Sequence, residues 1–492
     1  METAAKDDGR KASEGCSRCI RRRSFLAGLT GLASIGGAAL LALGRERALG
    51  EAPPSKEKTR IRLVFSHHRQ DEGGKQSEPG WPFLGYDHEK TKKDILEKLK
   101  AACPDFEFLP STAYDTNDAK KVLDEDARAP ADGYLAYMIG GWAGAAGAIA
   151  EAGKPTVFAG DFLGASGEIL VAYAAAKRKG LKVVSVSSSR FEDVADALRP
   201  FGCFKKMRSS AILVVGGDPG PSGKAIEELF GTKVLPISFK EINDDYEKAD
   251  RARAREWADL WMREAQKVVE PAREEIEKSA AMYLALRSLL ERHKADAITM
   301  NCLGGVYSGQ THAYPCLGFF QLNSDGGVGA CEADIESTLS MLVMKHLTGT
   351  PGYISDPVLD TAQKRIVYVH CVAPNRVFGP KGRTNPYEIR SHAEDRRGAA
   401  VRSLMPLGEM TTTLRISPTR REVIFHQAKT VANIDDPKSC RSKLAAEVKG
   451  DMEKLESEWD QWGWHRVTFY GDHKRAVKSF CALSGFRLVE EA

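Results

Sequence analysis

Residues 315–374 read PCLGFFQLNSDGGVGACEADIESTLSMLVMKHLTGTPGYISDPVLDTAQKRIVYVHCVAP, and the pattern of the chain changes within them. Apolar residues recur at helical spacing from Ile335 to Val343 and predict a helix that ends at Gly349. From Tyr353 onward the sequence turns to short β-rich runs with turn residues between them. The stretch therefore marks the start of a β-rich C-terminal domain.

On the N-terminal side, strand-like runs alternate with helical stretches, which predicts parallel strands joined by crossover helices. A helix at 168–179 starts a second round of the same pattern, and two long charged helices lead into its last strand. We predict an α/β fold, with two N-terminal Rossmann-like α/β units followed by the β-rich domain. The expected strands are 61–66, 106–109, 134–139, 155–159, 182–186, 211–215 and 297–300, and the long helices are 242–269 and 272–294.

Four segments follow from these patterns. Residues 1–50 form a signal segment, 51–170 the N-terminal α/β domain, and 171–348 a second α/β domain that carries Glu332. Residues 349–492 form the β-rich domain that carries Asp356 and His465. This last segment is expected to close with a helix at 452–459, a strand at 467–470, a helix at 474–483 and a short final strand.

The N-terminus has the features of an export signal. Arg21, Arg22 and Arg23 precede an uncharged run of 19 residues, 25–43, and the arrangement resembles a twin-arginine signal. We therefore expect an exported, periplasmic protein. An uncleaved run would instead anchor it as a single span, and no other membrane contact is expected.

The charge balance argues against nucleic acid as a partner. Residues 1–50 hold nine Lys and Arg and five Asp and Glu, which leaves 62 residues of each sign in 51–492. A body that is formally neutral lacks the basic excess that neutralises phosphates. The run GGDPGPSGK at 216–224 also fails as a phosphate-binding loop, because Ala225 stands where Ser or Thr is needed.

Four polar residues around the transition are candidate ligands. Glu332 opens the predicted helix, where the helix dipole favours a carboxylate, although it would also fit a simple helix-terminus role. Asp356 stands before Pro357 at a predicted strand end, where it suits a cleft or a turn. His370 ends another predicted strand, as a ligand or as a core histidine, and His465 precedes the strand at 467–470.

Taken together, these residues resemble the L-fucose isomerases and, more weakly, the L-arabinose isomerases. The resemblance rests on the interval of 24 residues from Glu332 to Asp356, the LTG-x-P at the helix end and the terminal H-x-x-T-x-Y-G. It covers chiefly residues 300–492. It implies that Glu332, Asp356 and His465 bind a divalent metal, and that His370 occupies the place of the additional histidine of the arabinose enzymes. Asn301 and Asn323 are candidates for the wall of the sugar pocket.

The resemblance implies a metal-dependent aldose–ketose isomerase that acts on a fucose- or arabinose-like monosaccharide through an enediol. Glu332 and Asp356 would be the catalytic carboxylates. Two carboxylates and an imidazole form a mostly hard donor set, for which we expect Mn²⁺. A homo-oligomer, a trimer or a hexamer, is implied as well. The alternatives are an exported carbohydrate-binding protein without catalysis and a metal-dependent sugar epimerase.

Overall fold

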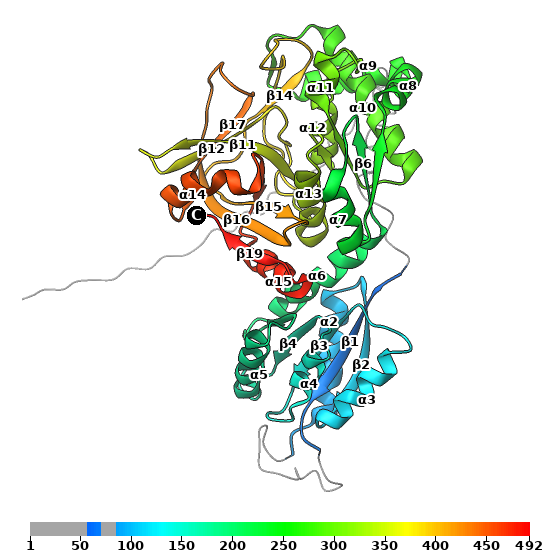
Figure 1. Ribbon diagram of the computed structural model, residues 1–492, viewed down its shortest axis with the longest axis vertical. Helices are drawn as coiled ribbons and strands as arrows, with labels where there is room; N and C mark the ends of the chain where they lie inside the picture. Colours follow the sequence, from blue (N-terminus) through cyan, green and yellow to red (C-terminus); the bar gives the residue numbers. More distant parts are fainter. Residues whose placement is uncertain (1–56, 70–84) are drawn as a thin grey trace, which may run out of the picture. The chain divides into compact units, whose positions relative to one another are not determined.

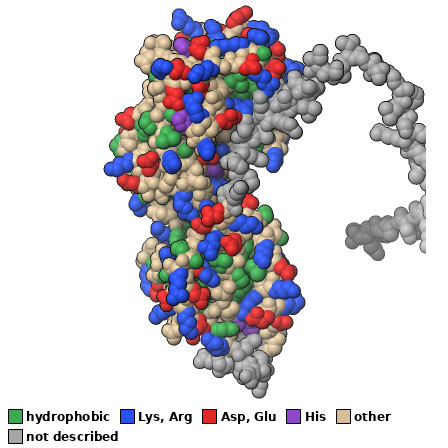
Figure 2. All heavy atoms as spheres, turned by 90° about the vertical axis from the view of Figure 1, so that its right-hand side faces the viewer, with side chains coloured by type: hydrophobic (Ala, Val, Ile, Leu, Met, Phe, Trp, Pro, Cys, Tyr) green, Lys and Arg blue, Asp and Glu red, His purple; other side chains and the backbone are tan. Residues whose placement is uncertain are grey.

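The computed structural model describes residues 57–69 and 85–492. The predicted signal segment, residues 1–50, lies outside the described residues, and the predictions of export and cleavage remain predictions. Within the described part, no helix combines the length and the apolar character that a membrane crossing requires. Figure 2 shows acidic and basic side chains interspersed over the face that it draws.

The first sheet has five parallel strands in the order β2-β1-β3-β4-β5, drawn in blue to teal in Figure 1. Its strands are β1 (Thr59–Ser66), β2 (Phe106–Ala113), β3 (Gly133–Met138), β4 (Thr156–Gly160) and β5 (Val183–Ser185). The helices between and after them are α2 (His88–Ala102), α3 (Thr116–Asp126), α4 (Ala145–Glu151), α5 (Ser166–Arg178) and α6 (Glu192–Ser209). Strand β5 is the edge strand of this sheet, and helix α5 connects it to β4. The sequence pattern had instead predicted that a second unit begins with these two elements. The domain boundaries themselves remain predictions.

The second sheet has four parallel strands in the order β10-β9-β6-β7. Its strands are β6 (Ala211–Val215), β7 (Lys233–Ile237), β9 (Ala297–Met300) and β10 (Gly329–Ala330). Its helices are α7 (Gly220–Phe230), α8 (Phe239–Lys248), α9 (Arg251–Glu264), α10 (Arg273–His293), α11 (Cys302–Tyr307) and α12 (Cys316–Ser324). The predicted strands 211–215 and 297–300 correspond to β6 and β9, whereas β7 and β10 were not predicted.

One predicted element of this unit is wrong. The long helix expected at 242–269 is two helices, α8 and α9, followed by the short strand β8 (Lys267–Val268). The break arises because Ala249 is extended and the side chain of Asp250 accepts hydrogen bonds from the first N–H groups of α9. Strand β8 pairs with β13 (Tyr387–Arg390), which in turn pairs with β14 (Ala400–Ser403).

The C-terminal part is β-rich, as predicted, and its larger sheet closes into an antiparallel barrel. The order β15-β18-β11-β12-β17-β16 is closed by pairing of β15 with β16, and β19 adds to β16 in parallel. Its strands are β11 (Gly352–Asp360), β12 (Arg365–His370), β15 (Met410–Ser417), β16 (Glu422–Asn433), β17 (Ser442–Lys449), β18 (Arg466–Tyr470) and β19 (Arg487–Glu490). Three helical elements follow β17: α14 (Met452–Glu458), the 3-10 helix η2 (Trp459–Trp462) and α15 (Lys474–Ser484).

Helix α13 (Ile335–Thr348) connects the second sheet to the barrel. It contacts β9 on one side and β11, β15 and β18 on the other. Its apolar residues Leu339, Leu342 and Val343 are buried, as their helical spacing predicted. The N-terminus of α13 therefore lies where the carboxyl edge of a parallel sheet meets the barrel.

A buried charge network holds strand β18 to the C-terminal segment. Arg466 is fully buried and donates a hydrogen bond to Glu491 Oε2 at 2.9 Å. Its guanidinium carbon lies over the ring of Trp459, 4.2 Å from the ring centre. His426 Nδ1 lies 2.8 Å from Glu491 Oε1. Burial raises the pKa of the Glu491 carboxyl, but the hydrogen bond from His426 and the charge of Arg466 outweigh it and hold the pKa below its ordinary value.

Candidate active site

Three of the predicted residues come from neighbouring strands of the barrel. Asp356 lies in β11, His370 is the last residue of β12, and His465 immediately precedes β18. Strand β11 pairs with β18 up to Ser355 and with β12 from Asp356 onward. Antiparallel pairing therefore brings residues that are far apart in the sequence to one end of the barrel.

We predicted that the strand that carries Asp356 would end before Pro357, and this prediction is wrong. Strand β11 continues to Asp360, and Pro357 lies opposite Tyr368 of β12. The proline is tolerated because β18 no longer pairs with β11 beyond Ser355, so the missing N–H is not needed on that edge.

Glu332 is not in the first turn of a helix, which corrects a second prediction. It lies in the loop between β10 and α13, and both Glu332 (φ 63°) and Ala333 (φ 51°) are left-handed. This conformation is unfavourable for residues with a Cβ. Ala333 N donates to Met300 O at 2.9 Å, and a Cβ at Gly217 would lie 2.6 Å from the Ala333 Cβ. The glycine thus leaves the space for a tight loop that presents Glu332 beyond the edge of the second sheet.

The loop and the barrel bring four predicted side chains together. His465 Nε2 lies 3.2 Å from Asp356 Oδ1 and 3.5 Å from Glu332 Oε2. His370 Nε2 lies 3.6 Å from Glu332 Oε1. One donor atom each of Glu332, His370 and His465 lies within 4.8 Å of the other two. Such an arrangement of oxygen and nitrogen atoms suits one divalent cation.

Asp334 is a central residue that the sequence analysis missed. Its Oδ2 atom is 2.9 Å from His465 Nδ1 and accepts a hydrogen bond from Arg415 Nη1 at 2.8 Å. Its Oδ1 atom caps α13 by accepting from Ser337 N at 2.9 Å. A carboxylate on Nδ1 fixes the ring of His465 so that Nε2 points at Glu332 and Asp356. The D-x-x-S pattern before an apolar run is the signal that identifies this cap.

Two carboxylates of the site, Asp334 and Asp356, have lowered pKa values. Burial raises the pKa of Asp334, but hydrogen bonds from His465 and Arg415 bring it well below its ordinary value. Burial also raises the pKa of Asp356. The hydrogen bonds that it accepts from His465 and Trp464, together with the nearby charge of His370, outweigh burial, so its pKa is lowered as well. Asp334 and Asp356 are therefore ionised over the physiological pH range.

Both histidines have raised pKa values. Burial lowers the pKa of His465, but hydrogen bonds to Asp334 and Asp356 outweigh burial and raise it to about 9. His370, 1% exposed, has a pKa well above its ordinary value because the neighbouring Cys371 and Glu332 outweigh burial. Its Nε2 atom is buried and has no hydrogen-bond partner among the described residues. The surroundings of both rings thus favour a positive charge at this point.

The two predicted asparagines have structural roles. Asn323 is 1% exposed, and its amide donates to Gly329 O at 2.9 Å and accepts from Gly329 N at 2.7 Å. These bonds hold β10 in place, and the proposed place of Asn323 in the wall of a sugar pocket stays a prediction. Asn301 caps α11 by accepting from Gly304 N and donates to Gly216 O at 3.3 Å.

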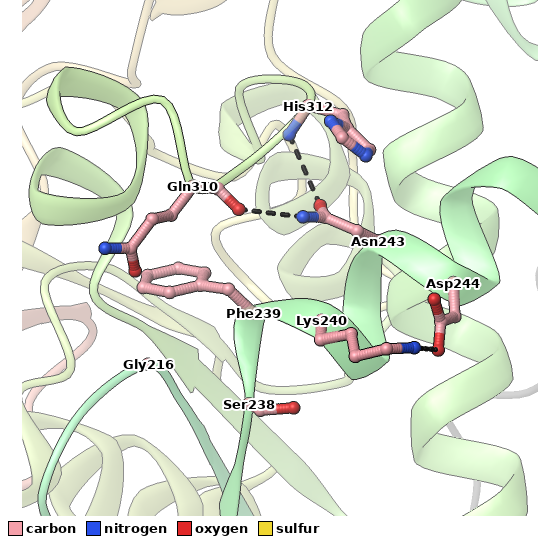
Figure 3. Close-up of a pocket in the computed structure, with 8 residues that line it drawn as sticks. All are labelled: Gly216, Ser238, Phe239, Lys240, Asn243, Asp244, Gln310 and His312. Atoms are coloured by element: carbon pink, nitrogen blue, oxygen red, sulfur yellow. Dashed lines mark hydrogen bonds and ion pairs between the residues drawn. The ribbon is translucent and has the colours of Figure 1, made fainter.

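Several cavities lie near these elements in the described part of the chain. One, of about 680 Å³, lies beside α8, where the Asn243 amide joins Gln310 O and His312 N (Figure 3). It is lined by Gly216, Ser238, Phe239, Lys240, Asn243, Asp244, Gln310 and His312. A second cavity, of about 430 Å³, adjoins Ala333, Asp334 and Arg415. Its size is in the range of small-molecule sites, and it lies directly beside the cluster of carboxylates and imidazoles.

Comparison with known proteins finds relatives that are named sulfoquinovose isomerases. The chain is 26% identical over 310 residues to the protein of Clostridium sp. (strain MSTE9), which covers 56% of this chain and 64% of the relative. It is 25% identical over 151 residues to the protein of Priestia megaterium, a match that covers 30% of this chain and 34% of the relative. It is 23% identical over 192 residues to the protein of Alkalicoccus urumqiensis, a match that covers 37% of this chain and 42% of the relative. The matches thus span less than two thirds of the length of these relatives.

Two other comparisons add little. No family model matches the chain. Among solved structures, a XylFII molecule aligns with 56% of this chain and 96% of its own, at 14% identity and a TM-score of 0.14. A score this low carries no structural argument. The comparisons thus show one thing, that the chain is similar over part of its length to proteins named sulfoquinovose isomerases.

Proposed function

We propose that the protein is an aldose–ketose isomerase that acts on a monosaccharide at the cluster of Glu332, Asp356 and His465. The observation that carries the proposal is the approach of His465 Nε2 to both carboxylates, 3.5 Å and 3.2 Å away, at the junction of a parallel sheet and the barrel. The partial similarity to proteins named sulfoquinovose isomerases supports the same class of reaction.

The same residues fit a divalent cation. Glu332, Asp356 and His465 would hold it, and His370 is the additional donor, because its buried Nε2 faces Glu332 and has no other partner in the described chain. Mixed carboxylate and imidazole donors accept Mn²⁺, which remains our proposal for the ion. When bound, such a cation would withdraw charge from adjacent sugar oxygens and so ease removal of a proton from the neighbouring carbon.

The residues of the chain would move the protons. Isomerisation transfers one proton between C1 and C2 and another between the two oxygens. Glu332 and Asp356 approach His465 from the loop and from the barrel, and they would serve as the two carboxylates that take and return these protons. Asp334 keeps His465 oriented. Trp464, 59% exposed, donates to Asp356 Oδ1 at 2.7 Å and offers an apolar surface on which a sugar ring can pack.

The substrate class follows from the resemblance and from the relatives. A fucose- or arabinose-like sugar is the candidate that the sequence motifs suggest, and the name of the relatives adds sulfoquinovose. The test incubates the purified full chain, loaded with Mn²⁺, with L-fucose, L-arabinose and sulfoquinovose, and measures ketose. Formation of a ketose from any of the three supports the proposal. Binding without turnover would favour a carbohydrate-binding protein, and inversion of configuration without ketose would favour an epimerase.

The orienting role of Asp334 leads to a prediction. Asp334→Asn keeps the shape of the side chain but removes the charge that holds the ring of His465 and faces Arg415. We expect the affinity for Mn²⁺ to fall by about 10- to 100-fold, as for other residues that orient a metal-binding histidine. Isothermal titration measures it. Asp115→Asn, at the exposed cap of α3, removes a comparable cap far from the site in sequence and serves as the control. Equal affinity in both variants would exclude an orienting role.

The raised pKa of His465 predicts how metal binding depends on pH. A cation needs the neutral imidazole, so it must displace the proton that the metal-free site holds up to about pH 9. Displacing the proton of His465 should make the apparent affinity for Mn²⁺ rise about tenfold per pH unit up to about pH 9, and displacing a proton from His370 as well would steepen the rise. Conversely, the stabilisation of the metal-free fold by this proton is complete below about pH 6.5 and is lost as the pH rises through about 9. Titrations from pH 6 to 9.5 that show a constant affinity would contradict this.

A further inference from the structure

A further cavity, of about 560 Å³, lies between strand β11 and the segment that runs from α14 to Trp464. Two residues of its lining are sequence neighbours of the proposed metal ligands, because Pro357 follows Asp356 and Trp464 precedes His465. The volume is in the range of small-molecule sites. This groove therefore borders the candidate active site, and a ligand could extend from one into the other.

The apolar wall of the groove is held in place by hydrogen bonds. It consists of Trp459, Trp464, Pro357 and Leu359. The indole N–H of Trp464 donates to Asp356 Oδ1 at 2.7 Å, and that of Trp459 donates to Trp464 O at 2.8 Å. Trp464 nevertheless remains 59% exposed. An aromatic surface that is already fixed loses little conformational entropy when a ligand packs on it.

The polar rim of the groove carries carboxylates and no cation. Glu456 and Asp460 line it, and both are exposed. Neither side chain has an ion-pair or hydrogen-bond partner among the described residues. The described residues that line the groove include no Lys, Arg or His. Carboxylate oxygens accept hydrogen bonds from hydroxyl groups and repel an anionic group. The rim thus favours a ligand with hydroxyl donors and without negative charge.

We propose that the substrate is an oligosaccharide whose reducing-end unit reacts at the candidate active site while the next unit, a neutral sugar, occupies this groove. A sugar ring has apolar C–H groups on its faces, which suit the two indoles, and hydroxyl groups at its edge, which suit Glu456 and Asp460. Trp464 would lie between the two units, since it bonds to Asp356 and also lines the groove. The inference rests on the proposed isomerase function and specifies its substrate class.

The second unit takes no part in the bond changes. At the reducing end, one proton moves from C2 to C1 and another from O2 to O1, and the glycosidic bond stays intact. The reaction therefore balances without a co-reactant. The groove contributes binding energy from a part of the substrate that does not react. For one packed ring and its hydrogen bonds, we expect about a tenfold gain in affinity and in kcat/KM.

The test compares L-arabinose with α-1,5-linked L-arabinobiose, and D-glucose with cellobiose, on the full chain loaded with Mn²⁺. Isothermal titration measures binding, and ketose formation measures turnover. In the wild type, at least one disaccharide should bind about tenfold more tightly than its own reducing-end monosaccharide. Glu456→Gln/Asp460→Asn should lose this preference. The matched control is Glu97→Gln/Glu453→Gln, at two exposed carboxylates outside the groove, and it should keep the preference.

The outcomes separate this inference from the proposed function. Ketose from a monosaccharide, with no disaccharide bound more tightly, would keep the isomerase and overturn the second unit. A disaccharide preference that the groove variant loses, without any ketose, would keep the groove and overturn the isomerase. Equal preference in both double variants would overturn the role of the groove. Binding of tetramethylammonium that the groove variant loses, without disaccharide binding, would overturn the proposal in favour of a cation site.

Discussion

Glu332→Gln is expected to lower kcat for the sugar that gives ketose by about 10²- to 10⁴-fold, the range in which a positioned acid–base group contributes. Glutamine has the same shape as glutamate and keeps one oxygen near His465, but it cannot accept a proton at neutral pH. The change also removes one negative charge that lies 3.5 Å from His465 Nε2. The measurement is initial rates of ketose formation at saturating Mn²⁺, so that weaker metal binding does not account for the loss.

The matched control is Asp360→Asn. Asp360 is a carboxylate at the C-terminal end of the strand that carries Asp356, where its Oδ1 accepts from Gln363 N at 3.1 Å. The control should keep the activity of the wild type. Activity of Glu332→Gln within threefold of the control would remove Glu332 from the catalytic role, whatever its part in holding a cation.

Arg466→Met is expected to lower the free energy of unfolding by about 3–5 kcal/mol, because it leaves Glu491 charged, buried and without the guanidinium that pairs with it. Arg466 is fully buried and bonds to Glu491, Gly463 O and Trp459 O. Methionine fills a similar volume, so a cavity adds little to the loss. Urea unfolding followed by tryptophan fluorescence measures the change, since three tryptophans lie at 459–464.

The comparison for this variant is Lys474→Ala. Lys474 pairs with Glu490 at 3.0 Å, but both side chains are more than a third exposed, and such pairs contribute at most about 1 kcal/mol. A difference of less than 1 kcal/mol between the two variants would mean that His426 alone satisfies Glu491. Because His465 adjoins Arg466 in the sequence, the loss of stability should be accompanied by weaker metal binding.

The fold was largely predictable because its parallel strands are short apolar runs with clear turn signals. The same signals predicted short strands beyond Tyr353, of which one ends at His370, as β12 does, and one at 467–470 matches β18 within one residue. Closure of the barrel was not predictable, since pairing of β15 with β16 and of β11 with β18 depends on contacts between distant segments. The break between α8 and α9 is a local signal, the Asp250 cap, that a helical interpretation of the charged run overlooked.

The candidate site could be predicted in part for a similar reason. The motifs around Glu332, Asp356 and His465 identify side chains that the fold does bring together. The left-handed loop that presents Glu332 could not be predicted, because neither residue 332 nor residue 333 is a glycine. The surrounding structure stabilises this conformation.

The most direct test of the account is the manganese content of the full chain and of His465→Ala after equilibrium dialysis against Mn²⁺. His465 is the residue that approaches both carboxylates, so its loss should dismantle the site while leaving Glu332 and Asp356 in place. We expect about one Mn²⁺ per wild-type chain and a content near zero in the variant. Equal manganese in the two proteins, whether bound or absent, would contradict it.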